Sequence, residues 1–90
     1  MVLCQPMYYV YVLENSSGKL YVGFSSNLKR RFKKHNLGYV KSTKPYLPWR
    51  IIFYEAYLKS KDAKRRERYL KTAKGRTILK TMLKGYFEEK

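Results

Sequence analysis

Two strand-like segments joined by a short polar turn constrain the fold of this chain more than any other feature. Residues 7–13 and 19–24 are rich in tyrosine, valine and leucine, and the segment between them contains an asparagine, two serines and Gly18. Aromatic and β-branched residues favour strands, and glycine tolerates the left-handed backbone of a tight turn. The pattern therefore predicts a β-hairpin.

The turn also predicts which residues share a face of the hairpin. If residues 16–18 form a three-residue loop that ends in a left-handed glycine, Asn15 faces Lys19. In this even register Tyr11 and Tyr21 lie on one face as diagonal neighbours, close enough for large side chains to meet. Four other hairpin residues are interpreted as structural filling alone: Tyr8, Tyr9, Val10 and Val12.

A short helix is predicted after the hairpin. Residues 26–27 offer a serine or an asparagine as N-cap, and Gly38 is a stop signal. At about 100° per residue, Leu28, Phe32 and His35 form one stripe. Arg31 lies at its margin, and four basic residues point outward: Lys29, Arg30, Lys33 and Lys34.

The remaining sequence predicts a third strand and two more helices. Residues 39–49 contain two prolines and no period, which indicates a loop. Residues 50–57 are rich in branched and aromatic residues, and Ser60 is a candidate cap for a helix that reaches residue 73. An apolar stripe after Gly75 predicts the last helix.

Together these elements predict an α/β fold: a small three-stranded antiparallel sheet flanked by helices, in the order β-β-α-β-α-α. The chain has 90 residues, the usual length of one domain. We therefore expect a single domain over residues 1–90, with its core at about residues 7–84.

The charge balance indicates a polyanionic partner. The chain carries 21 Lys and Arg against 6 Asp and Glu, a formal net charge of +15. Such a charge attracts nucleic acid or an anionic membrane surface. Nucleic acid is the favoured partner, because neither terminus carries a long basic amphipathic helix. A solubilising surface would mix the two signs more evenly.

The cysteine content and the hydropathy pattern indicate an intracellular protein. The single cysteine, Cys4, excludes an internal disulfide and a cysteine-rich zinc site. No segment approaches the roughly 18 apolar residues of a membrane span, and the first seven residues do not resemble a signal peptide. We expect a cytoplasmic location and no membrane partner.

Glu67 occupies an unusual position for a carboxylate. On the helix predicted from residue 60 it falls near the inward stripe of Ala63 and Leu70. A carboxylate that faces a core must be paired or bind a cation. One reading is an ion pair with Arg31 or a lysine; the other is a metal ligand or catalytic acid, because one carboxylate with waters and substrate phosphates is a normal magnesium site.

His35 and the tyrosines admit two readings as well. His35 is either a satisfied core residue or a partner of Arg31, which lies four residues earlier on the same side. Most tyrosines pack in a core or stack on nucleobases. A tyrosine acts as a base near neutral pH only if cations lower its pKa from about 10. Arg31 and a metal at Glu67 are the candidate cations.

These residues together resemble the GIY-YIG nuclease family, in particular its small single-domain bacterial members. Residues 9–11 read YVY in the place of the first family motif, and residues 21–23 read YVG in the place of the second. Arg31 stands ten residues after the start of the second motif, as the family arginine does. His35 lies where many members carry histidine, and Glu67 matches the metal-binding glutamate.

The resemblance implies a metal-dependent endonuclease that hydrolyses DNA phosphodiester bonds, in repair or recombination. It implies Tyr11 as the base, Tyr21 as the residue that orients water or phosphate, and Arg31 as the stabiliser of transition-state charge. His35 would support or deprotonate Tyr11. Glu67 would hold one Mg²⁺ or Mn²⁺, and Gly23 belongs to the structural part of the second motif.

DNA is the expected partner, bound through its backbone, and a cytoplasmic nuclease of this kind would act at the nucleoid. The rival reading is a nucleic-acid-binding module of the same fold that does not cut; a basic protein of a ribonucleoprotein particle is a third. The sequence indicates no oligomeric state. Six residues are expected to contact the nucleic acid backbone: Lys29, Arg30, Lys33, Lys34, Lys41 and Lys44.

Overall fold

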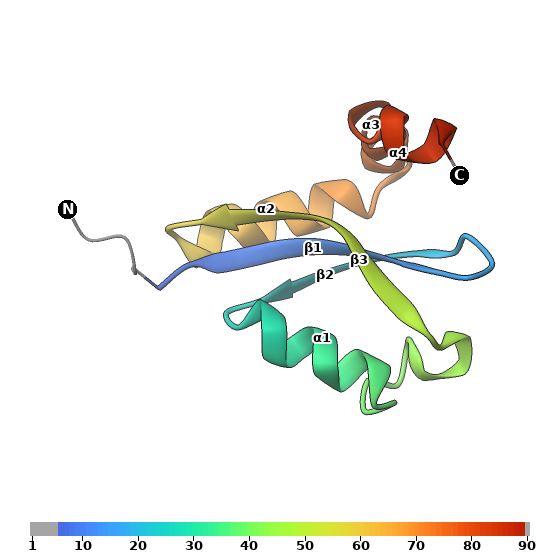
Figure 1. The fold of residues 1–90 in the computed structure, drawn as a ribbon. Helices are drawn as coiled ribbons and strands as arrows, with labels where there is room; N and C mark the ends of the chain where they lie inside the picture. Colours follow the sequence, from blue (N-terminus) through green and yellow to red (C-terminus); the bar gives the residue numbers. More distant parts are fainter. Residues whose placement is uncertain (1–5, 90) are drawn as a thin grey trace.

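A computed structural model describes residues 6–89; Cys4 lies outside the described residues. Three strands form one antiparallel sheet in the order β2-β1-β3 (Figure 1). The predicted α/β class and element order are confirmed, but the last predicted helix is divided into two. The elements are β1 (Tyr8–Asn15), β2 (Leu20–Ser25), α1 (Leu28–Asn36), the 3-10 turn η1 (Lys44–Tyr46), β3 (Trp49–Tyr57), α2 (Ser60–Leu70), α3 (Ala73–Met82) and α4 (Lys84–Glu88).

The hairpin has the predicted register. Gly18 adopts φ +86°, and the Asn15 amide donates to the Lys19 carbonyl at 3.1 Å. Tyr11 therefore lies opposite Gly23, two residues along β2 from Tyr21. The even register places both tyrosines on one face of the sheet, as diagonal neighbours.

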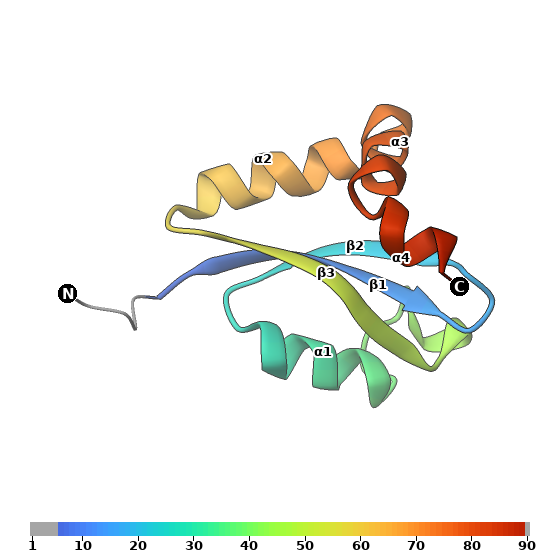
Figure 2. The ribbon, with the colours of Figure 1, turned by 45° about the horizontal axis from the view of Figure 1, so that its top comes forward.

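Helices cover both faces of the sheet (Figure 2). On one face Val10, Val12 and Val22 pack with apolar residues of α2 and α3 in a buried core. On the other face a second buried cluster contains Tyr11, Leu13 and Trp49, with Leu28 and Phe32 of α1 packed against it. Because successive residues of a strand point to opposite faces, β1 contributes to both clusters.

A β-bulge in β3 was not predicted. Val12 pairs with Phe53 but the next residue of β1, Leu13, pairs with Ile51. The extra residue, Ile52, lets both Ile52 and Phe53 pack against the α2 side. The same irregularity keeps Ile51 with Trp49 on the α1 side.

Two predicted helix boundaries on the C-terminal side are wrong. Ser60 is the first helical residue of α2 and not its cap: the N-cap is Lys59, whose side chain makes no capping hydrogen bond. The helix ends at Leu70 rather than at residue 73. Thr72 instead caps α3, accepting a hydrogen bond from the Gly75 amide at 3.0 Å. A Cβ on Gly75 would lie 2.0 Å from the Tyr69 carbonyl oxygen, so glycine here permits the tight α2–α3 junction.

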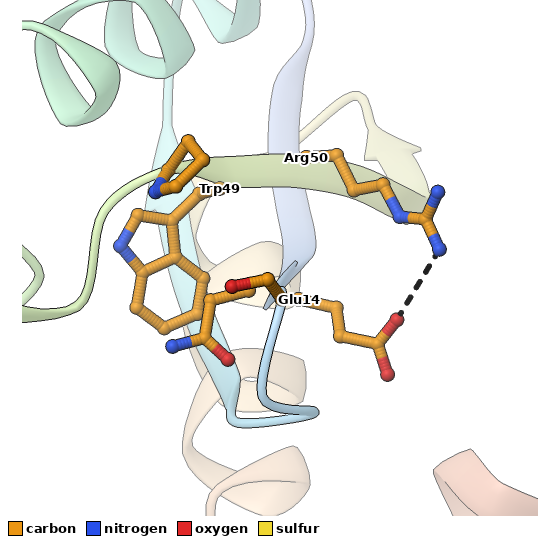
Figure 3. Close-up of a pocket in the computed structure, with 6 residues that line it drawn as sticks. Glu14, Trp49 and Arg50 are labelled. Atoms are coloured by element: carbon orange, nitrogen blue, oxygen red, sulfur yellow. Dashed lines mark ion pairs between the residues drawn. The ribbon is translucent and has the colours of Figure 1, made fainter.

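The buried carboxylate of Glu14, near the C-terminal end of β1, connects the sheet to helix α4. Glu14 is 2% exposed and accepts a hydrogen bond from the Tyr86 hydroxyl of α4. Arg50 on β3 places Nη2 3.7 Å from Glu14 Oε1, in the arrangement drawn in Figure 3. This cluster is satisfied within the fold and has a structural role.

Candidate active site

The Tyr11 hydroxyl lies at the centre of a polar cluster on the α1 face of the sheet. Tyr11 and His35 are both fully buried, and the Tyr11 oxygen is 2.7 Å from His35 Nε2. Arg31 Nε donates to the same oxygen at 3.4 Å. The Tyr21 ring lies beside them, 6.5 Å from the Tyr11 ring and 5.1 Å from the His35 ring between centroids.

The hydrogen bonds around His35 favour one tautomer. The Thr43 hydroxyl donates to the Val40 carbonyl oxygen, which leaves its own oxygen to accept from Nδ1–H, and the Tyr11 hydroxyl then donates to the unprotonated Nε2. The neutral ring then carries its proton on Nδ1, which lies 2.8 Å from Thr43 Oγ1 and donates to it. The Thr43 hydroxyl in turn points at the Val40 carbonyl oxygen, 3.4 Å away. In this tautomer the Nε2 lone pair of His35 accepts the hydrogen bond of the Tyr11 hydroxyl.

Burial holds Tyr11 and His35 in their neutral forms. Burial raises the pKa of Tyr11 to about 12, and Arg31 offsets only part of this effect. Burial and the nearby Arg31 charge lower the pKa of His35 to about 4. Arg31 alone does not favour the phenolate, because the cost of desolvating a phenolate exceeds the contribution of this one cation; the expected second cation is a metal at Glu67.

Gly23 makes room for the phenol. A Cβ at this position would lie 2.4 Å from both Cζ and the hydroxyl oxygen of Tyr11, closer than any real contact. The Tyr11 ring therefore crosses the backbone of the neighbouring strand, which explains in steric terms why glycine stands in the second motif. Any side chain here would push the hydroxyl away from His35.

The loop before β3 contributes residues that the sequence did not indicate. Thr43 is fully buried, although its segment has no periodic pattern. The Asn36 side chain makes two hydrogen bonds to the backbone of Trp49: it donates to the carbonyl oxygen and accepts from the amide, both at 2.8 Å. The Trp49 indole donates to the Thr43 carbonyl at 2.9 Å. These bonds fix the loop so that Thr43 meets His35.

Glu67 approaches the cluster from the other layer of the fold. It lies on α2, which packs on the face of the sheet opposite α1 (Figure 2), and its side chain is 21% exposed. Lys71 Nζ is 3.2 Å from Glu67 Oε2 and 5.8 Å from the centre of the Tyr21 ring. The Glu67 carboxylate also contributes to the raised pKa of Tyr11, because its negative charge disfavours the phenolate.

The ion pair expected as one alternative for Glu67 is thus present, with Lys71 rather than Arg31. The carboxylate still fits a hard divalent cation, because it is partly exposed and its partner, the Lys71 ammonium, belongs to a side chain that is about half exposed. Within residues 6–89, no three His, Cys, Asp or Glu side chains gather in a way that could hold a metal. A single carboxylate with waters and phosphate oxygens matches Mg²⁺ or Mn²⁺ better than zinc.

The predicted basic residues divide into groups around α1. All six are exposed, but only Arg30 and Lys34 line a hollow of about 260 Å³ together with Arg31. Lys29 lines a different hollow, and Lys33 projects about 160° away from Arg31 around the helix. The other two predicted contacts, Lys41 and Lys44, are exposed on the loop after α1.

Comparison with known proteins assigns the family. The model of the GIY-YIG catalytic domain matches residues 7–81, and the chain belongs to this family of nucleases. The chain is similar to a UPF0213 protein of Streptococcus agalactiae, with 41% identity over 70% of this chain and 73% of that protein. It is 36% identical to a UPF0213 protein of Clostridium perfringens, over 72% and 71% of the two chains.

A solved structure supports the same assignment. The solution NMR structure of a UPF0213 protein from Bacillus halodurans matches 84% of this chain and 84% of its own, with a TM-score of 0.54 and 30% identity. GIY-YIG nucleases generally depend on a divalent metal and act on nucleic acid. Within residues 6–89, none of the helices has the length and apolar character needed to span a bilayer.

Proposed function

We propose that this protein is a metal-dependent endonuclease that hydrolyses phosphodiester bonds of DNA. The observation that carries this proposal is the Tyr11 hydroxyl, which is hydrogen-bonded to His35 Nε2 at 2.7 Å and accepts from Arg31 Nε at 3.4 Å. A proton acceptor beside a phosphate-binding cation is what attack of water on a phosphodiester requires. We further propose that the protein acts in the cytoplasm, at the nucleoid, in repair or recombination.

In the proposed reaction Tyr11 relays a proton once substrate binding has given water access to its hydroxyl, which is fully buried in the unbound protein. As water attacks the phosphorus, one water proton moves to the Tyr11 oxygen while the Tyr11 proton moves to His35 Nε2. The imidazolium that forms keeps its Nδ1 hydrogen bond to Thr43, so neither ring rotates. This relay needs no stable phenolate, which agrees with the raised pKa of Tyr11.

Arg31 supplies fixed positive charge where the phosphate gains negative charge. Its pKa is raised, chiefly by the hydrogen bond to Tyr11, so it stays protonated throughout the reaction. Arg30 and Lys34 line the same hollow and would hold the neighbouring phosphates. Tyr21, whose ring packs against His35, would orient the phosphate or the water.

Glu67 is the residue that would hold the divalent ion at the border of this cluster. Bound Mg²⁺ or Mn²⁺ supplies Lewis-acid stabilisation of negative charge on phosphate oxygens. Lys71 would have to leave the Glu67 carboxylate, and its ammonium would then be free to contact the substrate backbone.

A plasmid assay tests this function. Purified protein is incubated with supercoiled plasmid and Mg²⁺ or Mn²⁺, beside an EDTA control. We expect nicking that EDTA abolishes and that falls about 100-fold or more in Arg31→Ala and Glu67→Gln. Glu88→Gln is the matched control, because Glu88 also forms an i,i+4 ion pair with a lysine but lies on α4.

Two results would contradict the proposal. If wild type leaves the plasmid intact at concentrations where gel shifts show binding, the protein is a nucleic-acid-binding module. If cleavage persists at the wild-type rate in both active-site variants, a contaminant cuts the plasmid and the residue roles are wrong.

A further inference from the structure

We propose that an aromatic hollow beside the active site binds an unpaired nucleobase of the substrate strand; this inference rests on the proposed nuclease function and specifies its substrate class. The hollow, of about 570 Å³, lies between α1 and the strands β1 and β3. Tyr9, Tyr54 and Phe32 supply its aromatic wall, and Lys29 stands at its border.

The exposure of this aromatic wall fits contact with a partner better than packing within the fold. Tyr54 is 55% exposed, although it lies in the middle of a strand. Its ring meets the partly exposed Tyr9 ring edge-on, at 6.1 Å between centroids and 62° between planes. Two tyrosine rings of this kind keep faces available to a third aromatic group. Tyr9 thus has a role beyond hairpin filling.

The aromatic hollow shares lining residues with the basic hollow that contains Arg31. Tyr54 is the cross-strand partner of Tyr11, so both tyrosines lie on the α1 face of the sheet. Ser26 and Asn27, at the start of α1, line this hollow and also the basic hollow that contains Arg31. A strand whose phosphate lies against Arg31 can therefore pass around the start of α1 and place a neighbouring base here.

The chemistry of the hollow identifies its occupant as a base. The net charge of +15 selects a polyanion, and Lys29 is exposed where the phosphate of that nucleotide would lie. Aromatic side chains stack on any base, so such a site tolerates all four. Bases of an intact duplex are stacked on one another and cannot enter. The hollow therefore selects single-stranded nucleic acid, or a nucleotide left unpaired at a flap or junction.

The test measures binding in EDTA, where no cleavage occurs. One probe is a 12-nucleotide single strand that contains 2-aminopurine, whose fluorescence falls when it stacks on an aromatic ring; the other is the same strand in a blunt duplex. We expect wild type to bind the single strand more tightly and to quench its fluorescence. Tyr54→Ala should weaken single-strand binding about tenfold and abolish the quenching, with duplex affinity and salt dependence unchanged.

Two further variants control this experiment. Tyr54→Phe keeps the ring and should bind as wild type does. Tyr39→Ala removes a tyrosine that is 74% exposed on the loop after α1, and should change neither affinity. Circular dichroism confirms that each variant is folded; because Tyr54 is largely exposed, its replacement should not unfold the protein.

Several outcomes would overturn the inference. Unchanged quenching in Tyr54→Ala, or an equal loss of affinity for both probes, would show that no base stacks in the hollow. If Tyr54→Ala instead converts a dimer into a monomer without changing either affinity, the hollow is a self-association surface. These failures are distinct from failure of the proposed nuclease function, which the plasmid assay with Mg²⁺ detects separately.

Discussion

The buried His35 should make the stability of this protein depend on pH. The pKa of His35 is about 4 in the folded protein, against 6.5 for an ordinary histidine, because the ring is buried beside Arg31. Between these values the unfolded chain binds more protons than the folded one. The stabilisation is therefore fully present above about pH 6.5 and is lost as pH falls towards 4. The pKa difference corresponds to about 3 kcal/mol.

Urea denaturation at a series of pH values measures this effect. Trp49 is the single tryptophan, is 4% exposed and packs near the site, so its fluorescence reports unfolding. His35→Gln is the control, because glutamine is polar but does not titrate. The carboxylates of the chain titrate in both proteins, so their contribution cancels in the difference between the two curves.

The expected result is a divergence between the two proteins. From pH 7 to pH 4 wild type should lose about 3 kcal/mol more unfolding free energy than His35→Gln. Parallel curves would refute the reasoning, because they would mean that the pKa of His35 is the same in the folded and the unfolded protein. Burial beside Arg31 would then not hold the ring neutral below pH 6.5.

Three further predictions concern single residues. Gly23→Ala should destabilise the protein by about 2 kcal/mol and abolish cleavage, because the added Cβ would lie 2.4 Å from the Tyr11 hydroxyl; an unchanged melting temperature would contradict this. Thr43→Val leaves the His35 Nδ1 proton without its acceptor and should cost about 1–3 kcal/mol in urea denaturation, whereas no loss would remove Thr43 from the relay. Arg30→Gln should reduce the magnitude of the slope of log affinity against log salt by about one, because Arg30 lines the basic hollow; Lys33→Gln should not, because Lys33 does not line it. Equal effects of the two substitutions would mean that the nucleic acid backbone does not bind specifically at the basic hollow.

The sequence predicted the hairpin and its tyrosine pair because local rules determine them. The turn length and the left-handed Gly18 set the register, and a period of two then places Tyr11 and Tyr21 on one face. The helical period likewise placed His35 inward and Arg31 at the margin of α1. Both expectations needed only neighbours in sequence.

Other parts of the site depend on contacts between distant segments. Thr43 meets His35 because Asn36 and Trp49 fix an irregular loop, and no periodic pattern marks such a residue. The sequence indicated that Glu67 lies near an inward stripe, but not that it pairs with Lys71, whose ammonium lies over the Tyr21 ring. The pKa of Tyr11 depends on a balance between burial, which raises it, and Arg31, which lowers it. Only the three-dimensional arrangement determines that balance.

The sequence did not predict the β-bulge or the α2–α3 junction, because both depend on packing between different elements of the fold. The bulge at Ile52 depends on how two layers share the apolar residues of β3, which strand propensity does not encode. The last helix was expected to begin after Gly75, but Gly75 lies within α3, where its missing side chain permits a close approach to the Tyr69 carbonyl. The same residue type can end a helix or allow two helices to meet.

Removal of the Tyr11 hydroxyl tests the central claim most directly. Tyr11→Phe keeps the buried ring and deletes the oxygen that joins His35 to Arg31. Tyr8→Phe is the matched control, because Tyr8 lies on the same strand but stacks on Phe24 on the opposite face. In single-turnover cleavage we expect Tyr11→Phe to be at least about 100-fold slower than wild type, with binding in EDTA unchanged, and Tyr8→Phe to cut normally. Cleavage by Tyr11→Phe at the wild-type rate would contradict the account.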